Sequence, residues 1–77
     1  MTRTNLLKAA MAENEYTAER LADEVGMSRQ SFSLKVNNKR RFNSDEISKI
    51  SHVLKLTPQR IIEIFFADDV GDQPTEP

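Results

Sequence analysis

The sequence predicts an all-α domain of five short helices. Apolar residues recur at helical spacing along most of the chain, and residues that favour helix N-termini precede several of these stretches. No segment of useful length alternates apolar and polar residues with the period of two that marks a strand. With 38% hydrophobic residues and only two glycines, the 77 residues can form one compact helical core.

The first helix is expected over residues 4–14. Its apolar face consists of four residues at helical spacing, which are Leu6, Leu7, Ala10 and Met11. Thr17 is a favourable N-cap for a second helix. Gly26 ends that helix, because a residue without a Cβ adopts the left-handed conformation at little cost. Ser28 then caps the third helix.

Two further helices follow a polar segment. Asn43 followed by Glu46 has the form of a capping box and predicts the start of the fourth helix. Thr57 and Pro58 are the N-cap and first residue of a fifth helix that runs to about Phe66. The buried stripe of the fourth helix is expected to comprise Ile47, Ile50 and Leu54.

Charge is distributed unevenly along the chain. The formal net charge is −1, yet residues 68–77 hold four acidic residues and no basic one. This composition predicts a disordered acidic tail that follows one domain over residues 1–67. Residues 28–41 contain no acid and five basic residues, which are Arg29, Lys35, Lys39, Arg40 and Arg41. A molecule with separate acidic and basic parts can bind a polyanion despite a net charge near zero.

Composition argues against several other classes of function. The chain has no cysteine, His52 has no partner at metal-ligand spacing, and two glycines cannot form a phosphate-binding loop. We therefore expect neither an enzyme nor a cofactor, metal or small-molecule ligand. No apolar run approaches the roughly 20 residues of a membrane span, and the first residues show no export signal. A cytoplasmic protein is expected.

Residues 18–37 have the spacing of a helix-turn-helix, in which two short helices meet at a sharp corner. Gly26 and Met27 form the corner. The inner faces are marked by apolar residues, which are Leu21, Ala22, Val25, Met27, Phe32 and Val36. In this motif the second helix is presented outward and lies in the DNA major groove.

The outward face of the third helix follows from a rotation of about 100° per residue, with Phe32 at the centre of the buried side. Val36 and Ser28 then fall close to the core, and Arg29 and Lys35 lie on opposite flanks. The outward side chains are Gln30, Ser33, Leu34 and Asn37. This surface suits base reading, since glutamine can bond adenine, arginine can bond guanine, and leucine can contact a thymine methyl.

Two neighbouring segments suit the phosphate backbone. The N-terminus of the second helix, around Thr17 and Ala18, offers free backbone N–H groups that attract anions. The polar segment beyond the third helix lies where a phosphate backbone would pass. It consists of Asn37, Asn38, Lys39, Arg40 and Arg41.

The run YTAERLADEVGMSRQSFSLKVNN, residues 16–38, resembles the helix-turn-helix of lambda-repressor-like, Cro-type bacterial and phage regulators. The resemblance covers about residues 4–66, since that family adds one helix before the motif and two after it. The pattern I-x-x-I-x-x-V-L-x-L ending at Leu56 also matches. The strongest matching positions within the run are Leu21, Ala22, Gly26, Met27, Ser28, Phe32 and Asn37.

This resemblance implies a sequence-specific DNA-binding transcriptional regulator, of the small phage or prophage repressor type, dimeric on a palindromic operator. It implies base contacts at Ser28, Arg29, Gln30, Ser33, Leu34 and Asn37. Ala18 departs from the family, which commonly has a glutamine there, and Leu34 stands where the family often has a polar or basic residue.

The fifth helix is more apolar than one buried stripe requires. Ile61, Ile64 and Phe65 cluster on one side, whereas Ile62 and Phe66 lie about 100–140° away. We expect Ile62 and Phe66 to be exposed in the monomer and to form a homodimer across a two-fold axis. The alternative is that the first helix or the tail covers the fifth helix.

Two other functions fit the same sequence. A protein-interaction module, such as an antitoxin or antirepressor-type adaptor, would use Leu34 and the apolar face of the fifth helix. An architectural DNA-binding protein would use only the basic segment and would ignore sequence. The salt dependence of binding, together with discrimination among DNA sequences, distinguishes these functions.

Overall fold

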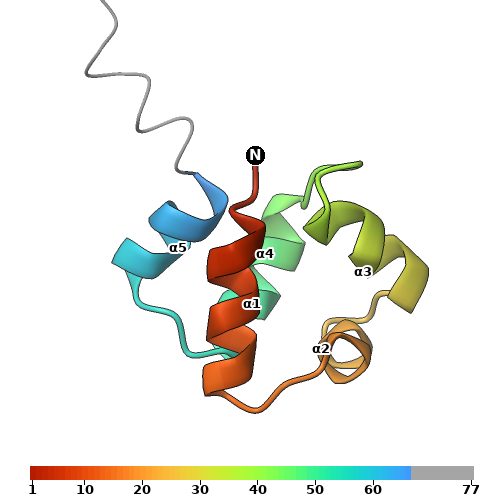
Figure 1. Cartoon of the computed structure of the whole chain (residues 1–77), viewed down its shortest axis with the longest axis horizontal. Coiled ribbons are helices and arrows are strands. Elements are labelled where there is room, and N and C mark those ends of the chain that lie inside the picture. Colours follow the sequence, from red (N-terminus) through yellow and green to blue (C-terminus); the bar gives the residue numbers. More distant parts are fainter. Residues whose placement is uncertain (67–77) are drawn as a thin grey trace, which may run out of the picture.

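The computed structural model describes residues 1–66, which form five helices. Figure 1 shows how the helices pack around one another. They are α1 (Thr4–Glu13), α2 (Ala18–Glu24), α3 (Arg29–Val36), α4 (Ser44–Val53) and α5 (Pro58–Phe65). Residues 1–66 contain no strand, so the all-α class with five helices is confirmed. The predicted tail over residues 68–77 lies outside the described residues. None of the five helices is long and apolar enough to cross a membrane.

Four helices begin at the side-chain caps that the sequence predicts. The hydroxyl oxygens of Thr17, Ser28 and Thr57 each accept a hydrogen bond from the backbone N–H three residues later, at 3.0–3.2 Å. Asn43 and Glu46 form the capping box of α4, with N···O distances of 2.8 and 3.0 Å. Each cap satisfies a backbone donor that the first helical turn leaves without a partner, which fixes where the helix begins.

The α2–α3 connection turns sharply at Gly26, which has a φ of +77° as the sequence predicts. The backbone N–H of Met27 then donates to the carbonyl of Ala22 at 2.8 Å, and the Met27 side chain packs against the core. Figure 1 shows α2 nearly end-on while α3 runs across the view at one edge of the molecule. The two helices therefore cross steeply.

One hydrophobic core joins all five helices. Phe42, in the α3–α4 connection, packs edge-to-face on Phe32 of α3 and Phe65 of α5, with ring centroids 6.0 and 5.6 Å apart. The other buried apolar residues are Leu7, Ala10, Met11, Leu21, Ala22, Val25, Val36, Ile50, Leu54 and Ile64. Phe42 therefore packs between α3 and α5, and its contact with the buried Phe32 keeps that face of α3 turned toward the core.

The N-terminal residues connect the ends of α3 and α5. The backbone N–H of Arg3 donates to the carbonyl of Ile64 at 2.7 Å, and the hydroxyl of Thr4 donates to the carbonyl of Val36 at 2.6 Å. These bonds satisfy carbonyl groups near the C-termini of two helices, which would otherwise lack intrahelical partners. Arg3 thereby joins the end of α5 to the start of α1, and Thr4 joins the end of α3 to α1.

One sequence prediction about the core is wrong, and another is correct only in part. Leu6 is 38% exposed, because it lies about 100° from Leu7 on α1 and the buried stripe falls on Leu7, Ala10 and Met11. Ile47 is only partly buried, although it packs against the core beside Ile50.

Candidate nucleic-acid interface

The predicted outward face of α3 is largely exposed. Phe32 and Val36, on the opposite side, are only 1% and 5% exposed. Leu34 is half-buried, so less of its side chain is accessible than the sequence suggests. The exposed residues of this face, hereafter the α3 outer face, are Arg29, Gln30, Ser33 and Asn37. Short polar groups and one guanidinium therefore form a surface that can donate and accept hydrogen bonds.

Asn37 is fixed at the C-terminal end of the α3 outer face. Its side-chain Nδ2 donates to the carbonyl of Ser33 at 2.9 Å and to the Ser33 hydroxyl oxygen at 3.5 Å. These bonds orient the amide, and its Oδ1 is left without a bond to the described residues. That oxygen can accept a hydrogen bond from an external donor.

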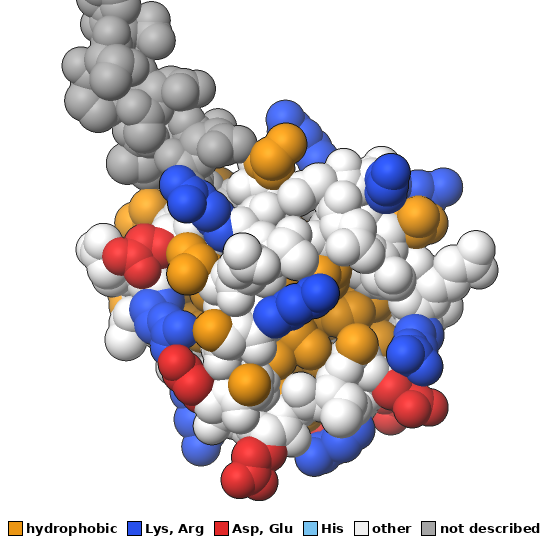
Figure 2. All heavy atoms as spheres, viewed as in Figure 1, with side chains coloured by type: hydrophobic (Ala, Val, Ile, Leu, Met, Phe, Trp, Pro, Cys, Tyr) orange, Lys and Arg blue, Asp and Glu red, His pale blue; other side chains and the backbone are white. Residues whose placement is uncertain are grey.

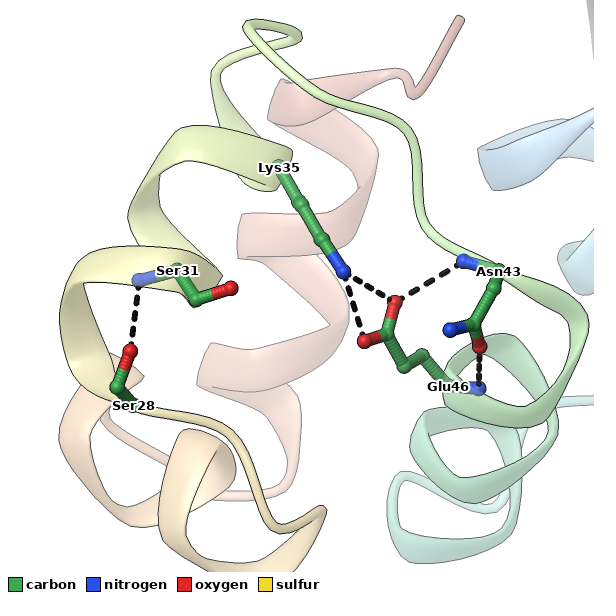
Figure 3. A network of polar contacts seen from close by, with 5 residues as sticks. All are labelled: Ser28, Ser31, Lys35, Asn43 and Glu46. Atoms are coloured by element: carbon green, nitrogen blue, oxygen red, sulfur yellow. Dashed lines mark hydrogen bonds and ion pairs between the residues drawn. The ribbon is translucent and has the colours of Figure 1, made fainter.

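Ser28 is exposed, so its expected position close to the core is wrong. With φ −70° and ψ 154° it has an extended backbone, and the rotation of a helix does not apply to a residue outside the helix. Its Oγ accepts a hydrogen bond from the N–H of Ser31 at 3.0 Å (Figure 3). The hydroxyl proton stays available, which leaves Ser28 able to donate at the start of α3.

Lys35 does not belong to the basic surface that the sequence predicts. Its Nζ lies 2.8 and 2.7 Å from the two carboxylate oxygens of Glu46, and Figure 3 shows it reaching from α3 across to α4. The two side chains are only 14% and 16% exposed. The flank of α3 that carries Lys35 faces α4, so this charge is neutralised inside the fold.

The environment of Glu46 keeps its carboxylate ionised. Burial alone raises the pKa of Glu46, but hydrogen bonds from Lys35 and the Asn43 backbone, with the charges of Lys35 and Lys49, outweigh that effect. The pKa of Glu46 therefore lies below its ordinary value of 4.5. The carboxylate and Lys35 form a charged pair that couples α3 to α4.

Three adjacent cations follow α3 in the α3–α4 connection. The side chains of Lys39, Arg40 and Arg41 are exposed and make no hydrogen bond or ion pair with the described residues. Figure 2 shows Lys and Arg side chains at the upper right, over this connection. These three cations, hereafter the basic loop, can attract an external anion without first breaking an ion pair within residues 1–66.

Asn38, predicted to contact phosphate, already uses its side-chain amide within the chain. Its Oδ1 accepts from the backbone N–H of Thr2 at 2.8 Å, and its Nδ2 donates to the carbonyl of Thr2 at 3.0 Å. Asn38 has a φ of +64°, a conformation that asparagine tolerates just after a helix. The sequence does not indicate this contact between residues 36 positions apart.

The N-terminus of α2 lies beside the α3 outer face. Ala18, which is half-buried, lines a hollow together with Arg29, Ser33 and Asn37. The hydroxyl of Thr17 accepts from the N–H of Arg20, so one of the backbone donors predicted to attract anions is already bonded. Ala18 and the α3 outer face therefore border a common surface.

Ile62 of α5 and Phe66, which follows the last residue of α5, are the two exposed apolar side chains that the sequence predicts. Ile62 is 39% and Phe66 37% exposed, whereas Ile64 and Phe65 are buried and Ile61 packs against the core. An ion pair of 2.8 Å between Arg60 and Glu13 joins α5 to α1 without covering these two side chains fully. Parts of the Ile62 and Phe66 side chains therefore remain accessible on the surface.

Comparison with known proteins gives a family. A family model with the description "Protein of unknown function (DUF739)" matches residues 5–68. The chain belongs to this family. The match extends over the five-helix region and includes the whole of the α3 outer face. No curated protein matches the chain.

The described residues contain no cluster of side chains that could bind a metal ion. His52 is exposed, and no group of three His, Cys, Asp or Glu within residues 1–66 is placed to hold a metal. The candidate site therefore consists of the α3 outer face, the basic loop and the N-terminus of α2.

Proposed function

We propose that this protein is a sequence-specific DNA-binding transcriptional regulator, a small phage or prophage-type repressor of the lambda-repressor-like, Cro-type class. In this proposal α2, the turn at Gly26 and α3 act as a helix-turn-helix, and α3 lies in the major groove. The observation that carries the proposal is the exposed row of polar groups on α3, directly opposite Phe32 and Val36.

The chemistry of this row favours base reading over simple solvation. A solvated helix face usually mixes glutamate and lysine, but α3 has no acidic residue and its lysine is paired with Glu46. Gln30 can make two hydrogen bonds to adenine, and Arg29 can make two to guanine. Each such contact discriminates against a wrong base by about 1–3 kcal/mol.

The basic loop supplies affinity without choosing sequence. In this proposal Lys39, Arg40 and Arg41 contact phosphates at the C-terminal end of α3, and Asn38 holds the loop against Thr2. Contacts to phosphate release counterions, so binding weakens steeply as salt increases. Their place beyond the helix leaves the α3 outer face free for the bases.

Two copies are needed for a useful affinity and specificity. One small module buries about 600–1,000 Å² on DNA, which is at the low end for specific binding. We propose that Ile62 and Phe66 pair across a two-fold axis, because both are large, apolar and exposed. A symmetric dimer reads an inverted repeat whose half-sites lie about 34–36 Å apart.

Two substitutions test the proposal. Gln30→Ala is expected to change which duplexes bind best, and Arg40→Ala to weaken binding to all duplexes alike. The measurement is the dissociation constant for a set of duplexes between low and moderate salt. Arg40→Ala should make the log–log salt slope shallower by about 0.9 for each phosphate that Arg40 binds in the wild type. Unchanged DNA affinity in both variants would instead favour a protein-interaction module that uses Leu34 and α5.

A further inference from the structure

A hollow of about 190 Å³ lies between α1 and α3, beside the N-terminus of α2. Met11, Phe32 and Val36 form its apolar floor, and the small side chain of Ala18 leaves one edge open. Figure 2 shows hydrophobic side chains accessible in this region, with a Lys or Arg side chain extending across it. We refer to it as the α1–α3 hollow.

The rim of the α1–α3 hollow carries two cations. Lys8 of α1 and Arg29 of α3 are both exposed, and neither side chain makes a hydrogen bond or ion pair with the described residues. No acidic residue among residues 1–66 lines the hollow. An apolar floor beneath two cations fits a ligand with a small, weakly polar body attached to an anionic group.

The hollow is continuous with the α3 outer face. Arg29, Ser33 and Asn37 belong to both surfaces. With α3 docked in the major groove as proposed, a DNA strand that borders the groove passes over this hollow. The sugar–phosphate backbone of that strand has the required chemistry, because deoxyribose is largely apolar and each phosphate carries one negative charge.

We propose that the α1–α3 hollow receives one deoxyribose and its neighbouring phosphate, and that Lys8 binds this phosphate. The proposal rests on the proposed function and adds a contact from α1, which the sequence does not indicate. Lys8 is a positioning residue: it sets how α3 is seated in the groove without reading a base.

The first test compares Lys8→Gln with a matched control, Lys55→Gln. Lys55 is an exposed lysine in the α4–α5 connection, a segment that Figure 1 shows leading to α5, and it does not line the hollow. On a preferred duplex, Lys8→Gln should make the log–log salt slope shallower by about 0.9 for each bound copy. The Lys8→Gln variant should rank the duplexes by affinity in the same order as the wild type. The control variant Lys55→Gln should leave the log–log salt slope unchanged.

A second measurement separates a direct contact from a general effect of charge. Single phosphates of the duplex are replaced by neutral methylphosphonates, and the affinities of the wild type and Lys8→Gln are compared at each position. One position should weaken the wild type severalfold and Lys8→Gln hardly at all. Equal losses of affinity for both proteins at every position would overturn the proposal.

The outcomes also separate this inference from the proposed function. Wild-type protein that prefers particular duplexes, together with a wild-type salt slope in Lys8→Gln, overturns the role of Lys8 alone. Wild-type protein that binds no duplex overturns both the role of Lys8 and the proposed function.

Discussion

Glu46 performs two tasks with one carboxylate. Its Oε1 accepts hydrogen bonds from the backbone N–H of Asn43 at 3.0 Å and from the Nζ of Lys35 at 2.8 Å. The first bond belongs to the capping box of α4, and the second joins α4 to α3. The start of one helix and the orientation of its neighbour therefore depend on the same side chain.

We predict that Glu46→Gln lowers the free energy of unfolding by about 1.5–3 kcal/mol near neutral pH, because Lys35 loses a charged hydrogen-bond partner. The folded-state pKa of Glu46 lies below 4.5, so its stabilising effect is fully present above that value and disappears as pH falls through the folded pKa. Thermal unfolding across this range should show the wild type and Glu46→Gln converging in acid. Glu63→Gln, at an exposed position of α5, is the control and should follow the wild type. A constant difference at all pH values would contradict this account.

Single residues show how far the candidate site can be predicted from the sequence. The exposure of Gln30, Ser33 and Asn37 follows from helical periodicity alone, and the structure agrees. The partners of Lys35 and Asn38 could not be predicted, because they lie 11 and 36 residues away in the chain. Periodicity places a side chain on a flank of its helix, but only the packed fold determines what that flank faces.

At the scale of helices, the elements are predictable because their boundaries depend on local chemistry. Three helices begin at a residue whose hydroxyl accepts a hydrogen bond from the backbone N–H three residues later, namely Thr17, Ser28 and Thr57. Neighbouring residues alone therefore determine where these helices begin. Phe42 has no such signal, since it stands in a polar connection outside any periodic pattern. The structure places it between Phe32 and Phe65, where it joins α3 to α5.

The turn between α2 and α3 depends on the backbone of Gly26. A Cβ added at this position would have no heavy atom within 4 Å, so crowding does not oppose a substitution. The φ of +77° does oppose it. We predict that Gly26→Ala lowers the free energy of unfolding by about 1–2 kcal/mol, and that Gly26→Asn costs less because asparagine tolerates the left-handed region. Denaturant unfolding measures both, and equal stability of Gly26→Ala and the wild type would show that the turn adopts another conformation.

At the scale of the whole molecule, the surfaces that we propose to bind DNA and a second copy lie on different elements. The α3 outer face and the basic loop carry polar and cationic groups, whereas the exposed apolar pair is Ile62 of α5 and Phe66 at its C-cap. In the proposed dimer, this separation leaves α3 of each copy accessible to DNA.

We predict that Phe66→Glu abolishes self-association, because two carboxylates would face each other across the two-fold axis. Sedimentation over a range of concentrations should give a dimer for the wild type and a monomer for Phe66→Glu. The substitution should also reduce DNA affinity, since two half-sites then bind independently. Ile61→Val, beside the core, is a control that should remain dimeric. A wild type that stays monomeric at high concentration, unchanged by Phe66→Glu, would remove the dimer from the account.

The most direct test is selection of bound sequences from a random pool of DNA duplexes, performed in parallel with the wild type and Gln30→Ala. We predict that the wild type enriches an inverted repeat, with half-site centres separated by about one helical turn. Gln30→Ala should enrich the same repeat with its preference relaxed at one base pair of each half-site. Failure of the wild type to enrich any sequence, or an identical motif for both proteins, would contradict the claim that the outward face of α3 reads bases.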